Sequence, residues 1–398
     1  MKRVKSVSTI QPDADEIPDI KEAPDSPPPA KKKYHKAGYL PEIRKLKKIT
    51  VQGDKDYTVT KLIGEGVFGL VFEVVHKDRP FAMKVFKSGI PCAEEIFKKE
   101  VAILLETTEI SHENVLQLIR THTIVSPPSQ LTEMAILTEL FGPSIYDVQV
   151  SALKNRDCNT STFPIPAIRN IGQQILKGMC HLETLYIHHL DLKPENVYFY
   201  TKGFVVEEQE SQNCAKNPLK LAVIHKDDLR IRIGDFGSAN QHLPEHIPPA
   251  NLTVQMPNYR APEIFMGLPY TRKSDVWSFG CMLSEMYTGQ PLFYGSNSYD
   301  TESVQFEMIQ KVMRDAPSVR MWKEAFNGGG GTKVKSSNYG YQFAQIPHNS
   351  NPALPLFSNV RLDDSAALQL YKTIHKILVF DPKKRMTFFE VSGLQFFL

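Results

Sequence analysis

Cysteine is scarce in this chain, and none of the five cysteines forms a Cys-x-x-Cys pair. A disulfide framework and a zinc site built on such pairs are therefore excluded, and this cysteine usage is typical of a reducing compartment. A net charge of +3 is too small to predict nucleic acid or a membrane as the main partner. No apolar run reaches about 18 residues, so no membrane-spanning helix is expected. Residues 1–25 also lack the apolar core of a signal peptide, so secretion is not expected.

The length of 398 residues predicts two or three folded units, at about 150 residues per unit. Residues 1–50 have few aromatic side chains, a Pro-Pro-Pro run and many charges. They cannot bury enough apolar surface to offset the entropy of the chain, so we expect them to be disordered. Basic clusters lie there at residues 31–33 and 44–48. A nuclear import signal and a solvated, self-repelling tail explain these clusters equally well.

One stretch, His-Leu-Asp-Leu-Lys-Pro-Glu-Asn at residues 189–196, has the side chains that phosphoryl transfer needs. Asp191 can accept or orient the proton of an attacking hydroxyl, and Lys193 can meet the charge on the transferred group. Asn196 can hold a magnesium ion. A charged loop that follows a helix and contains a proline would have a similar composition. The interpretation therefore depends on partners elsewhere in the chain.

Those partners occur in the required order. Asp235-Phe236-Gly237 follows an alternating apolar and charged run at residues 229–233, which is typical of a half-buried strand. Upstream, a Gly-x-Gly-x-x-Gly loop at residues 64–69 lies between two β-like runs, where glycines let backbone amides approach phosphates closely. Such a loop alone could also open a dinucleotide-binding fold. Here, however, Lys84 lies on the next β-like run, and Ala-Pro-Glu follows at residues 261–263.

On these motifs the chain resembles a eukaryotic protein kinase over about residues 57–398. The resemblance implies an α+β fold with two lobes. A small β-rich N-lobe would cover about residues 57–140, and a larger, mainly helical C-lobe would cover about residues 141–398. ATP and Mg²⁺ are the cofactors that the resemblance implies.

The resemblance also assigns the catalytic and metal-binding residues. Glu100, in a helix predicted over residues 93–105, would pair with Lys84 and aim it at the α and β phosphates of ATP. Magnesium would be held by Asn196 and Asp235. The catalytic residues implied are Asp191, Lys193, Lys84 and Glu100.

For the adenine and ribose of ATP, the resemblance points to a strand predicted over residues 135–142. The Glu139 carbonyl and the Phe141 amide would bond adenine, and Thr138 would line the back of the adenine pocket. Asp147 would reach the ribose, although a helix cap is the alternative interpretation of this residue. The other residues expected to line the ATP site are Ile63, Gly64, Glu65, Gly66, Val67, Phe68, Gly69, Val71 and Ala82.

Further expectations concern the architecture of the C-lobe. A helix that is apolar nearly all round should begin with Ser274 as its N-cap and end at Gly289. By resemblance, Asp275 should bond the backbone of the loop at residues 189–196, and Arg385 should pair with Glu263. The polar insert between residues 196 and 235 should loop out over the surface.

Tyr-Arg-Ala-Pro-Glu at residues 259–263 is similar to the CMGC group of kinases. Within that group, residues 139–147, the polar insert and residues 234–239 resemble the LAMMER or CLK kinases, which phosphorylate Arg/Ser-rich splicing factors. Homeodomain-interacting and dual-specificity kinases are neighbouring branches. This chain departs from the LAMMER motif, since it has Phe-Glu-Met-Ile-Gln-Lys at residues 306–311. It also has Leu190 in place of the usual arginine and Met256 in place of the usual threonine.

Two functions stay open on this basis. The first is an ATP- and Mg²⁺-dependent kinase acting on Ser/Thr of proteins, such as Arg/Ser-rich splicing factors, with some tyrosine autophosphorylation. The second is a kinase-fold scaffold that binds nucleotide or partners without turnover, since Met256 cannot donate the hydrogen bond that a threonine hydroxyl makes. We further expect a monomer in the nucleus or cytoplasm that binds protein substrates, with no direct binding to nucleic acid or membrane.

Overall fold

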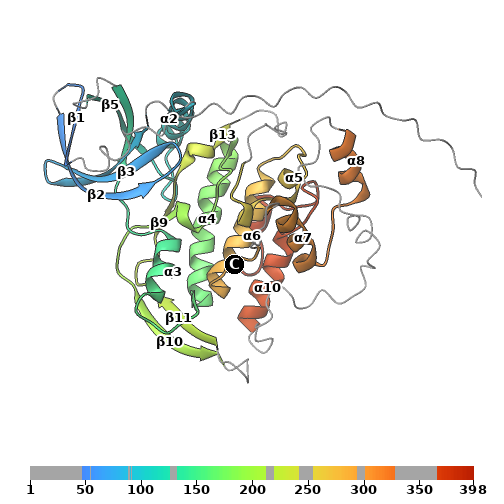
Figure 1. Cartoon of the computed structure of the whole chain (residues 1–398). Coiled ribbons are helices and arrows are strands. Elements are labelled where there is room, and N and C mark those ends of the chain that lie inside the picture. The colour runs from blue at the N-terminus through green and yellow to red at the C-terminus, as the bar shows by residue number, and fades with distance from the viewer. Residues whose placement is uncertain are drawn as a thin grey trace, which may run out of the picture. The chain divides into compact units, whose positions relative to one another are not determined.

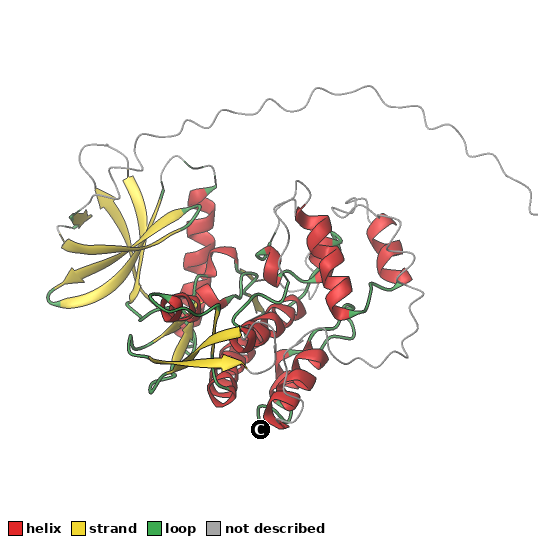
Figure 2. Ribbon diagram, turned by 60° about the horizontal axis from the view of Figure 1, so that its bottom comes forward, coloured by secondary structure: helices red, strands yellow, loops and turns green. Residues whose placement is uncertain are grey.

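The computed structural model describes residues 47–398 except 54, 88–89, 91, 126–131, 212–218, 242–253, 294–300 and 328–364. The described residues fall within one unit that spans residues 46–398. Strands make up its N-terminal part and helices most of the remainder, which confirms the predicted α+β fold (Figure 1 and Figure 2). Among the described residues, no helix combines the length and apolar composition needed to cross a membrane.

The N-terminal part is a closed antiparallel barrel with the strand order β1-β2-β3-β4-β6-β5. Side chains alternate between the two faces of each strand, so Leu70, Phe72 and Val74 of β3 all lie in the core. The two β-like runs that flank the glycine loop and the next one, which contains Lys84, are confirmed as strands. The barrel strands are β1 (Lys48–Val51), β2 (Lys55–Glu65), β3 (Gly69–His76), β4 (Arg79–Phe86), β5 (Leu118–Val125) and β6 (Thr132–Glu139).

The first strand corrects the prediction that disorder extends to residue 50. Ile49 and Val51 are each 1% exposed, and β1 pairs with β2 from Lys48 to Val51. Val51 also pairs with Ile124 of β5, which closes the barrel. These two alternating apolar side chains are enough to anchor a short strand once β2 and β5 offer free edges, although the surrounding composition is polar.

Helix α2 (Ala93–Glu109) packs against the barrel and confirms the helix predicted over residues 93–105, though it ends later. Its buried face combines the apolar side chains of Ile103 and Leu104 with the carboxylate of Glu100. Charged groups are rarely buried this deeply without a partner, so the position of Glu100 points to an ion pair inside the structure.

The helical part is organised around α6 (Lys273–Thr288), in which every side chain from Ser274 to Met286 is buried. Gly289 ends the helix in the left-handed conformation with φ 73°, as predicted. The N-cap prediction is wrong, because Lys273 is the first residue of the helix and Arg272, two positions before Ser274, is its N-cap. The Ser274 hydroxyl instead donates a hydrogen bond of 2.7 Å to Glu263.

Other helices surround α6, and short strands and 3-10 helices lie in the connections between them. The helices are α3 (Ile145–Leu153), α4 (Ile165–Thr184), α5 (Pro262–Phe265), α7 (Thr301–Met313), α8 (Val319–Asn327), α10 (Ser365–Ile377) and α11 (Phe388–Ser392). The short segments are β8 (Ile187–His188), η1 (Pro194–Asn196), β9 (Val197–Phe199), β12 (Ile231–Ile233), η2 (Phe236–Ser238), β13 (Asn240–Gln241) and η3 (Pro257–Tyr259).

The polar insert is a hairpin and not the surface loop that we predicted. Strand β10 (Val205–Ser211) pairs antiparallel with β11 (Leu219–His225), which pairs in parallel with β7 (Thr160–Thr162). Ala222 and Ile224 of β11 are fully buried, and this alternation provides an apolar face that packs onto the helical part. The run of glutamates in β10 hid this pattern from sequence analysis, because β10 is an edge strand whose side chains are mostly solvated.

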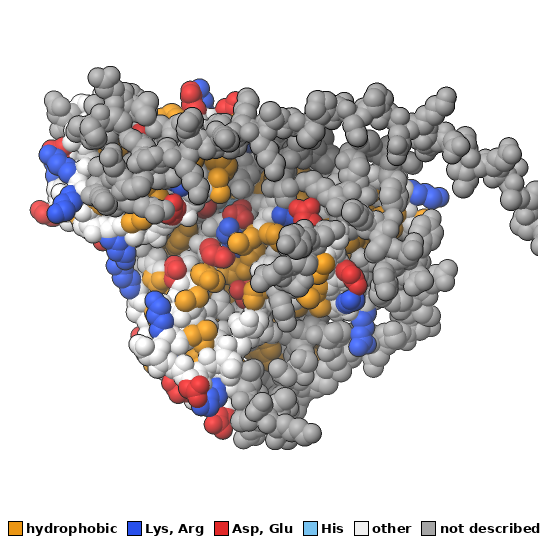
Figure 3. Space-filling view, viewed as in Figure 1, with side chains coloured by type: hydrophobic (Ala, Val, Ile, Leu, Met, Phe, Trp, Pro, Cys, Tyr) orange, Lys and Arg blue, Asp and Glu red, His pale blue; other side chains and the backbone are white. Residues whose placement is uncertain are grey.

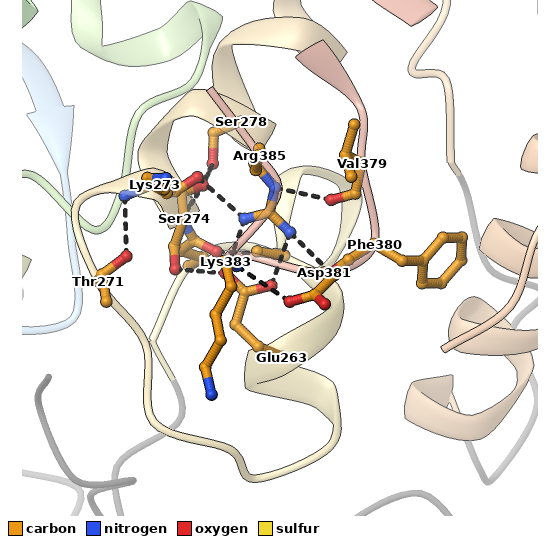
Figure 4. A network of polar contacts seen from close by, with 12 residues as sticks. Glu263, Thr271, Lys273, Ser274, Ser278, Val379, Phe380, Asp381, Lys383 and Arg385 are labelled. Atoms are coloured by element: carbon orange, nitrogen blue, oxygen red, sulfur yellow. Dashed lines mark hydrogen bonds and ion pairs between the residues drawn. The ribbon is translucent and has the colours of Figure 1, made fainter. Parts of the chain in front are cut away.

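A buried ion pair joins α5 to the segment after α10 (Figure 4). The Arg385 guanidinium donates to both carboxylate oxygens of Glu263 at 2.7 and 2.8 Å, and both side chains are fully buried. Arg385 also donates to the backbone carbonyls of Val379, Phe380 and Lys273. The predicted pairing of Arg385 with Glu263 is therefore confirmed, with a donor network that satisfies the buried cation.

Candidate active site

Three charged side chains meet where β4, α2 and the segment after β12 come together. Lys84 Nζ lies 2.8 Å from each carboxylate oxygen of Glu100 and 2.9 Å from Oδ1 of Asp235. In the barrel, Lys84 is held between Val71 of β3 and Ile136 of β6. The predicted pairing of Lys84 with Glu100 is confirmed, and Asp235 joins the same ammonium group.

The cluster fixes the charges of its members. The Lys84 ammonium holds the pKa of Asp235 at about 2, against the opposing effect of burial. Burial alone would lower the pKa of Lys84, but the carboxylates of Asp235 and Glu100 raise it above its ordinary value. For Glu100, burial outweighs the attraction of Lys84 and raises the pKa. Lys84 is therefore a cation and Asp235 an anion at neutral pH.

The loop at residues 189–196 brings a second set of side chains together. Lys193 Nζ donates to Oδ2 of Asp191 at 2.8 Å, and Asn196 Nδ2 donates to the same oxygen at 3.1 Å. Asn196 Nδ2 also donates to the Asp191 carbonyl at 2.8 Å. Within the described part of the chain, these contacts leave Oδ1 of Asp191 as the oxygen that can accept a proton from an incoming hydroxyl.

The donor atoms beside this loop suit a magnesium ion. Asn196 spends its amide nitrogen on Asp191, so its Oδ1 is the atom left to face a cation, and the Gly234 amide bonds the Asn196 carbonyl next to Asp235. An amide oxygen and a carboxylate oxygen are hard ligands that Mg²⁺ accepts. Among the described residues, no three or more His, Cys, Asp or Glu side chains form a group that could hold a metal ion. The pair therefore fits a magnesium that completes its coordination with water and phosphate oxygens.

His189 connects the two sets. Its Nε2 bonds the Gly234 carbonyl at 3.1 Å, and the Asp191 amide bonds its Nδ1 at 3.3 Å. Accordingly, Nε2 carries the proton and Nδ1 accepts. Burial lowers the pKa of His189, which keeps the ring neutral in this role.

The loop is also tied to α6, as predicted for Asp275. The Asp275 carboxylate accepts from the amides of His189 and Leu190 at 2.8 and 2.9 Å. Burial raises the pKa of Asp275 to about 7, although these two hydrogen bonds oppose the rise. Leu190, with φ 59°, lies in the left-handed region, so the two amides converge on one carboxylate.

The glycine loop turns from β2 into β3. The Gly66 amide bonds the Gly69 carbonyl at 2.9 Å, and a Cβ on Gly69 would lie 2.8 Å from the Val85 carbonyl oxygen. Lys87, which sequence analysis missed, follows the last residue of β4 and anchors the loop by donating to the Gly66 carbonyl at 2.8 Å. Val67 is 72% exposed at the tip. The predicted ATP-site residues of this hairpin are Ile63, Gly64, Glu65, Gly66, Val67, Phe68, Gly69 and Val71.

The residues predicted to contact adenine lie at the end of β6. Thr138 is buried and pairs across the sheet with Ala82, and Glu139 pairs with Phe81. Phe141 lies two residues after the end of β6, and its ring packs edge-on against Tyr200.

Asp147 has a structural role in addition to the one predicted for it. Ser144 is the N-cap of α3, and Asp147 completes a reciprocal capping box in which Oδ2 accepts from the Ser144 amide at 3.0 Å and hydroxyl at 2.8 Å. Both contacts are made by Oδ2, so this oxygen of Asp147 has the helix-capping role that was the alternative interpretation. Contact with a ribose stays a prediction for the other oxygen.

Sequence analysis also missed Gln255, and no motif marks it. Gln255 is buried at φ 61°, its amide bonds the Leu190 carbonyl, and its side chain bonds Ser274, Ser278 and Ala261. Met256, beside it, is 43% exposed. Gln255 therefore links the loop at residues 189–196 to α6, through its backbone amide on Leu190 and its side chain on Ser274 and Ser278.

Arg260 holds the same segment from the other side. Its guanidinium, 5% exposed, bonds the carbonyls of Val254 and Gln255 and lies 2.8 Å from the Glu302 carboxylate of α7. The sequence predicts that packing of Leu252 and Val254 orders this segment and that Thr253 is its phosphosite. Val254 packs against the core, whereas Leu252 and Thr253 lie outside the described residues.

A family model for the protein kinase domain matches residues 57–397. Dual specificity protein kinase lkh1 of Schizosaccharomyces pombe is 29% identical over 351 residues, which cover 86% of this chain and 46% of that protein. Probable dual specificity protein kinase madd-3 of Caenorhabditis elegans is 27% identical over 379 residues, covering 90% of this chain and 39% of that protein. The chain thus spans less than half the length of both relatives.

Among solved structures, the crystal structure of the PF14_0431 kinase domain matches with a TM-score of 0.67 and 23% identity. The match covers 89% of this chain and 98% of that one. At this identity the match supports the fold, in agreement with the barrel and helices described above.

Proposed function

Since the chain belongs to the protein kinase family, we propose that it transfers the γ-phosphate of ATP to serine and threonine of proteins. The observation that carries the proposal is the assembly of both charged sets. Lys84, Glu100 and Asp235 form one cluster, while Asp191 and Asn196 form the other beside it. Lys84 is a cation that can meet phosphate charge, and Asp235 is an anion that can meet magnesium.

The roles follow from this geometry. Glu100 orients Lys84 toward the phosphates, and Asp191 takes the proton of the attacking hydroxyl through Oδ1. Lys193, already within 2.8 Å of Asp191, faces the charge that develops on the phosphoryl group. Magnesium, held by Asn196 and Asp235, would neutralise phosphate charge when bound. Dual-specificity relatives extend the proposal to tyrosine in autophosphorylation.

We further propose that the substrates are basic, as Arg/Ser-rich proteins are. Glu195, within the catalytic loop, has a buried Oε2 with no hydrogen-bond partner in the described part of the chain. Burial raises its pKa, and an arginine side chain would satisfy this oxygen. On the face shown in Figure 3, acidic side chains gather between the barrel and the helical part. A basic peptide therefore has favourable electrostatics there.

The test is phosphate incorporation from ATP into a peptide library, with the Asp191→Asn variant as the matched control. We expect incorporation into serine and threonine next to arginine, and none above background with the variant. Equal signals from the two proteins would assign the activity to a contaminant. If neither protein incorporates phosphate although both bind nucleotide, the result would support the alternative of a scaffold without turnover, which the presence of Met256 suggests.

Thr138 should make the adenine pocket permissive to inhibitors that carry a group behind the adenine site. Threonine is smaller than phenylalanine, so Thr138→Phe should weaken such compounds at least tenfold, about 1.4 kcal/mol. The measurement is inhibitor affinity for both proteins, with an inhibitor that lacks the rear group as the control. Unchanged affinity for the extended inhibitor would show that Thr138 does not line the pocket.

Turnover should not depend on phosphorylation of the segment at residues 238–258. An arginine before the catalytic aspartate can read such a phosphate, but Leu190 is buried and has no donor. The end of the segment is instead held by Arg260, Gln255 and Glu302. Protein expressed alone and stripped by a phosphatase should keep its turnover on a basic peptide to within about tenfold, or about 1.4 kcal/mol. A larger loss that an added upstream kinase restores would show that another cation reads the phosphate.

A further inference from the structure

A polar cleft lies away from the charged clusters of the candidate active site. It has a volume of about 520 Å³ and is formed by α4, the turn that precedes β5, and the segments that flank β9 and β12. This volume falls within the range of about 300–1,000 Å³ typical of ligand-binding sites. None of the proposed catalytic or ATP-binding residues lines it.

The floor of the cleft contains an unused acceptor. Asn114 is 3% exposed, and its Nδ2 donates to the Ile231 carbonyl at 3.1 Å and to Gln174 at 3.2 Å. Its Oδ1 is buried and has no hydrogen-bond partner in the described part of the chain. A buried acceptor without a partner costs about 1–3 kcal/mol, so a ligand with an N–H donor would relieve a penalty that the free protein bears.

The rim adds two carboxylates, Glu113 and Asp227, which are exposed and for which the described residues provide no ion pair. A third, Asp228, is matched by Arg230, whose guanidinium lies 2.8 Å away. Lys177 is the remaining cation of the lining. Unpaired carboxylates beside amide side chains favour a ligand that combines peptide N–H groups with positive charge.

Other ligand classes fit less well. A nucleotide or nucleic acid would bring phosphates toward these carboxylates. The described residues hold no group of three or more side chains that could ligate a metal. Leu229 and Tyr200 are the apolar and aromatic side chains of the lining, which is otherwise charged or amide, and two such side chains are too few to hold a lipid chain. Gln174 is already bonded to Asn114, Asn170, Leu229 and Ile231, so the amide groups that a peptide backbone can bond are the Asn114 oxygen, the Gln173 oxygen and the Asn170 nitrogen.

We propose that this cleft docks an extended basic segment of a protein partner. The peptide backbone bonds Asn114, and arginine or lysine side chains pair with Glu113 and Asp227. The site also has a route to the active site, because Asn114 and Gln174 both bond the backbone of Ile231 in β12, the strand that leads to Asp235. Docking does not depend on turnover, so the proposal stands or falls separately from the proposed function.

The test is fluorescence polarisation of the full chain with a labelled peptide of alternating arginine and alanine, which contains no residue that can be phosphorylated. The Glu113→Gln/Asp227→Asn variant should bind this peptide at least tenfold more weakly than the unaltered protein. The matched control is Glu95→Gln/Glu210→Gln, which removes the same charge from two other exposed positions on α2 and β10. This control should bind as the unaltered protein does.

Three results would overturn the proposal. One is equal affinity for the rim and control variants, since only net charge would then matter. Another is weakening by Glu195→Gln but not by the rim variant, because the catalytic loop would then hold the peptide. The third is no measurable binding by the unaltered protein. Circular dichroism of each variant checks that a loss of binding is not a loss of fold.

Discussion

Replacing Asp235 with asparagine is expected to reduce phosphoryl transfer by about a thousandfold, because a bound metal contributes several kcal/mol and each 1.36 kcal/mol is tenfold in rate. Asparagine keeps the shape of the side chain but removes the negative charge. The Asp235 side chain is 40% exposed, and Lys84 keeps its contacts with Glu100, so the fold should not change. Initial rates at saturating ATP, together with thermal unfolding, measure the two effects separately.

Lys84→Met should abolish turnover as well, since it removes the cation that faces the phosphates. This variant leaves Glu100 buried without its partner, so part of its effect will appear as lost stability. The Asp235 variant is for this reason the cleaner test of the metal. A loss of less than about tenfold in Asp235→Asn, or about 1.4 kcal/mol, would reject the assignment of magnesium to Asp235 and Asn196.

The largest expected loss of stability follows from Arg385→Ala. Removing one partner of a buried ion pair costs about 3–5 kcal/mol, because the remaining charge is left uncompensated. Here Glu263 would be that charge, fully buried, and three backbone carbonyls would lose their donor at the same time. The measurement is the free energy of unfolding in urea.

Lys311→Ala provides the matched control for this change. Lys311 pairs with Glu307 at 2.7 Å within α7, but its side chain is 61% exposed. Exposed pairs contribute about 0–1 kcal/mol, so the control should unfold close to the unaltered protein. Similar losses in the free energy of unfolding for the two variants would mean that the burial of Arg385 does not determine how much its ion pair stabilises the fold.

The sequence was sufficient to predict contacts that a known family pattern specifies. Lys84 pairs with Glu100 as the resemblance implies, whereas the catalytic and magnesium-binding roles of Asp191, Asn196 and Asp235 stay predictions. The ion pair of Glu263 with Arg385 was predicted from resemblance, and it forms although 122 residues separate the two. At both ion pairs, the contact that the family resemblance implies is the contact that the structure contains.

The sequence was not sufficient where pairing partners decide the outcome. Strand β1 is short and β10 is rich in glutamate, and each forms because a strand edge is available elsewhere in the fold, on β2 and on β11. Gln255 has its role through a buried position at positive φ, which no spacing reveals. Ser274 is a residue type that often caps helices, but its hydroxyl donates instead to Glu263 of the neighbouring helix α5.

The closure of the barrel by β1 has a consequence for how the protein behaves in solution when shortened. The kinase family match begins at residue 57, so a chain trimmed to that match would lack β1 altogether. The outer edges of β2 and β5 would then present unpaired amides and carbonyls to other molecules, which is the usual starting point of edge-to-edge aggregation. A chain that keeps the residues from Lys48 onward keeps β1, and the edges of β2 and β5 then stay paired.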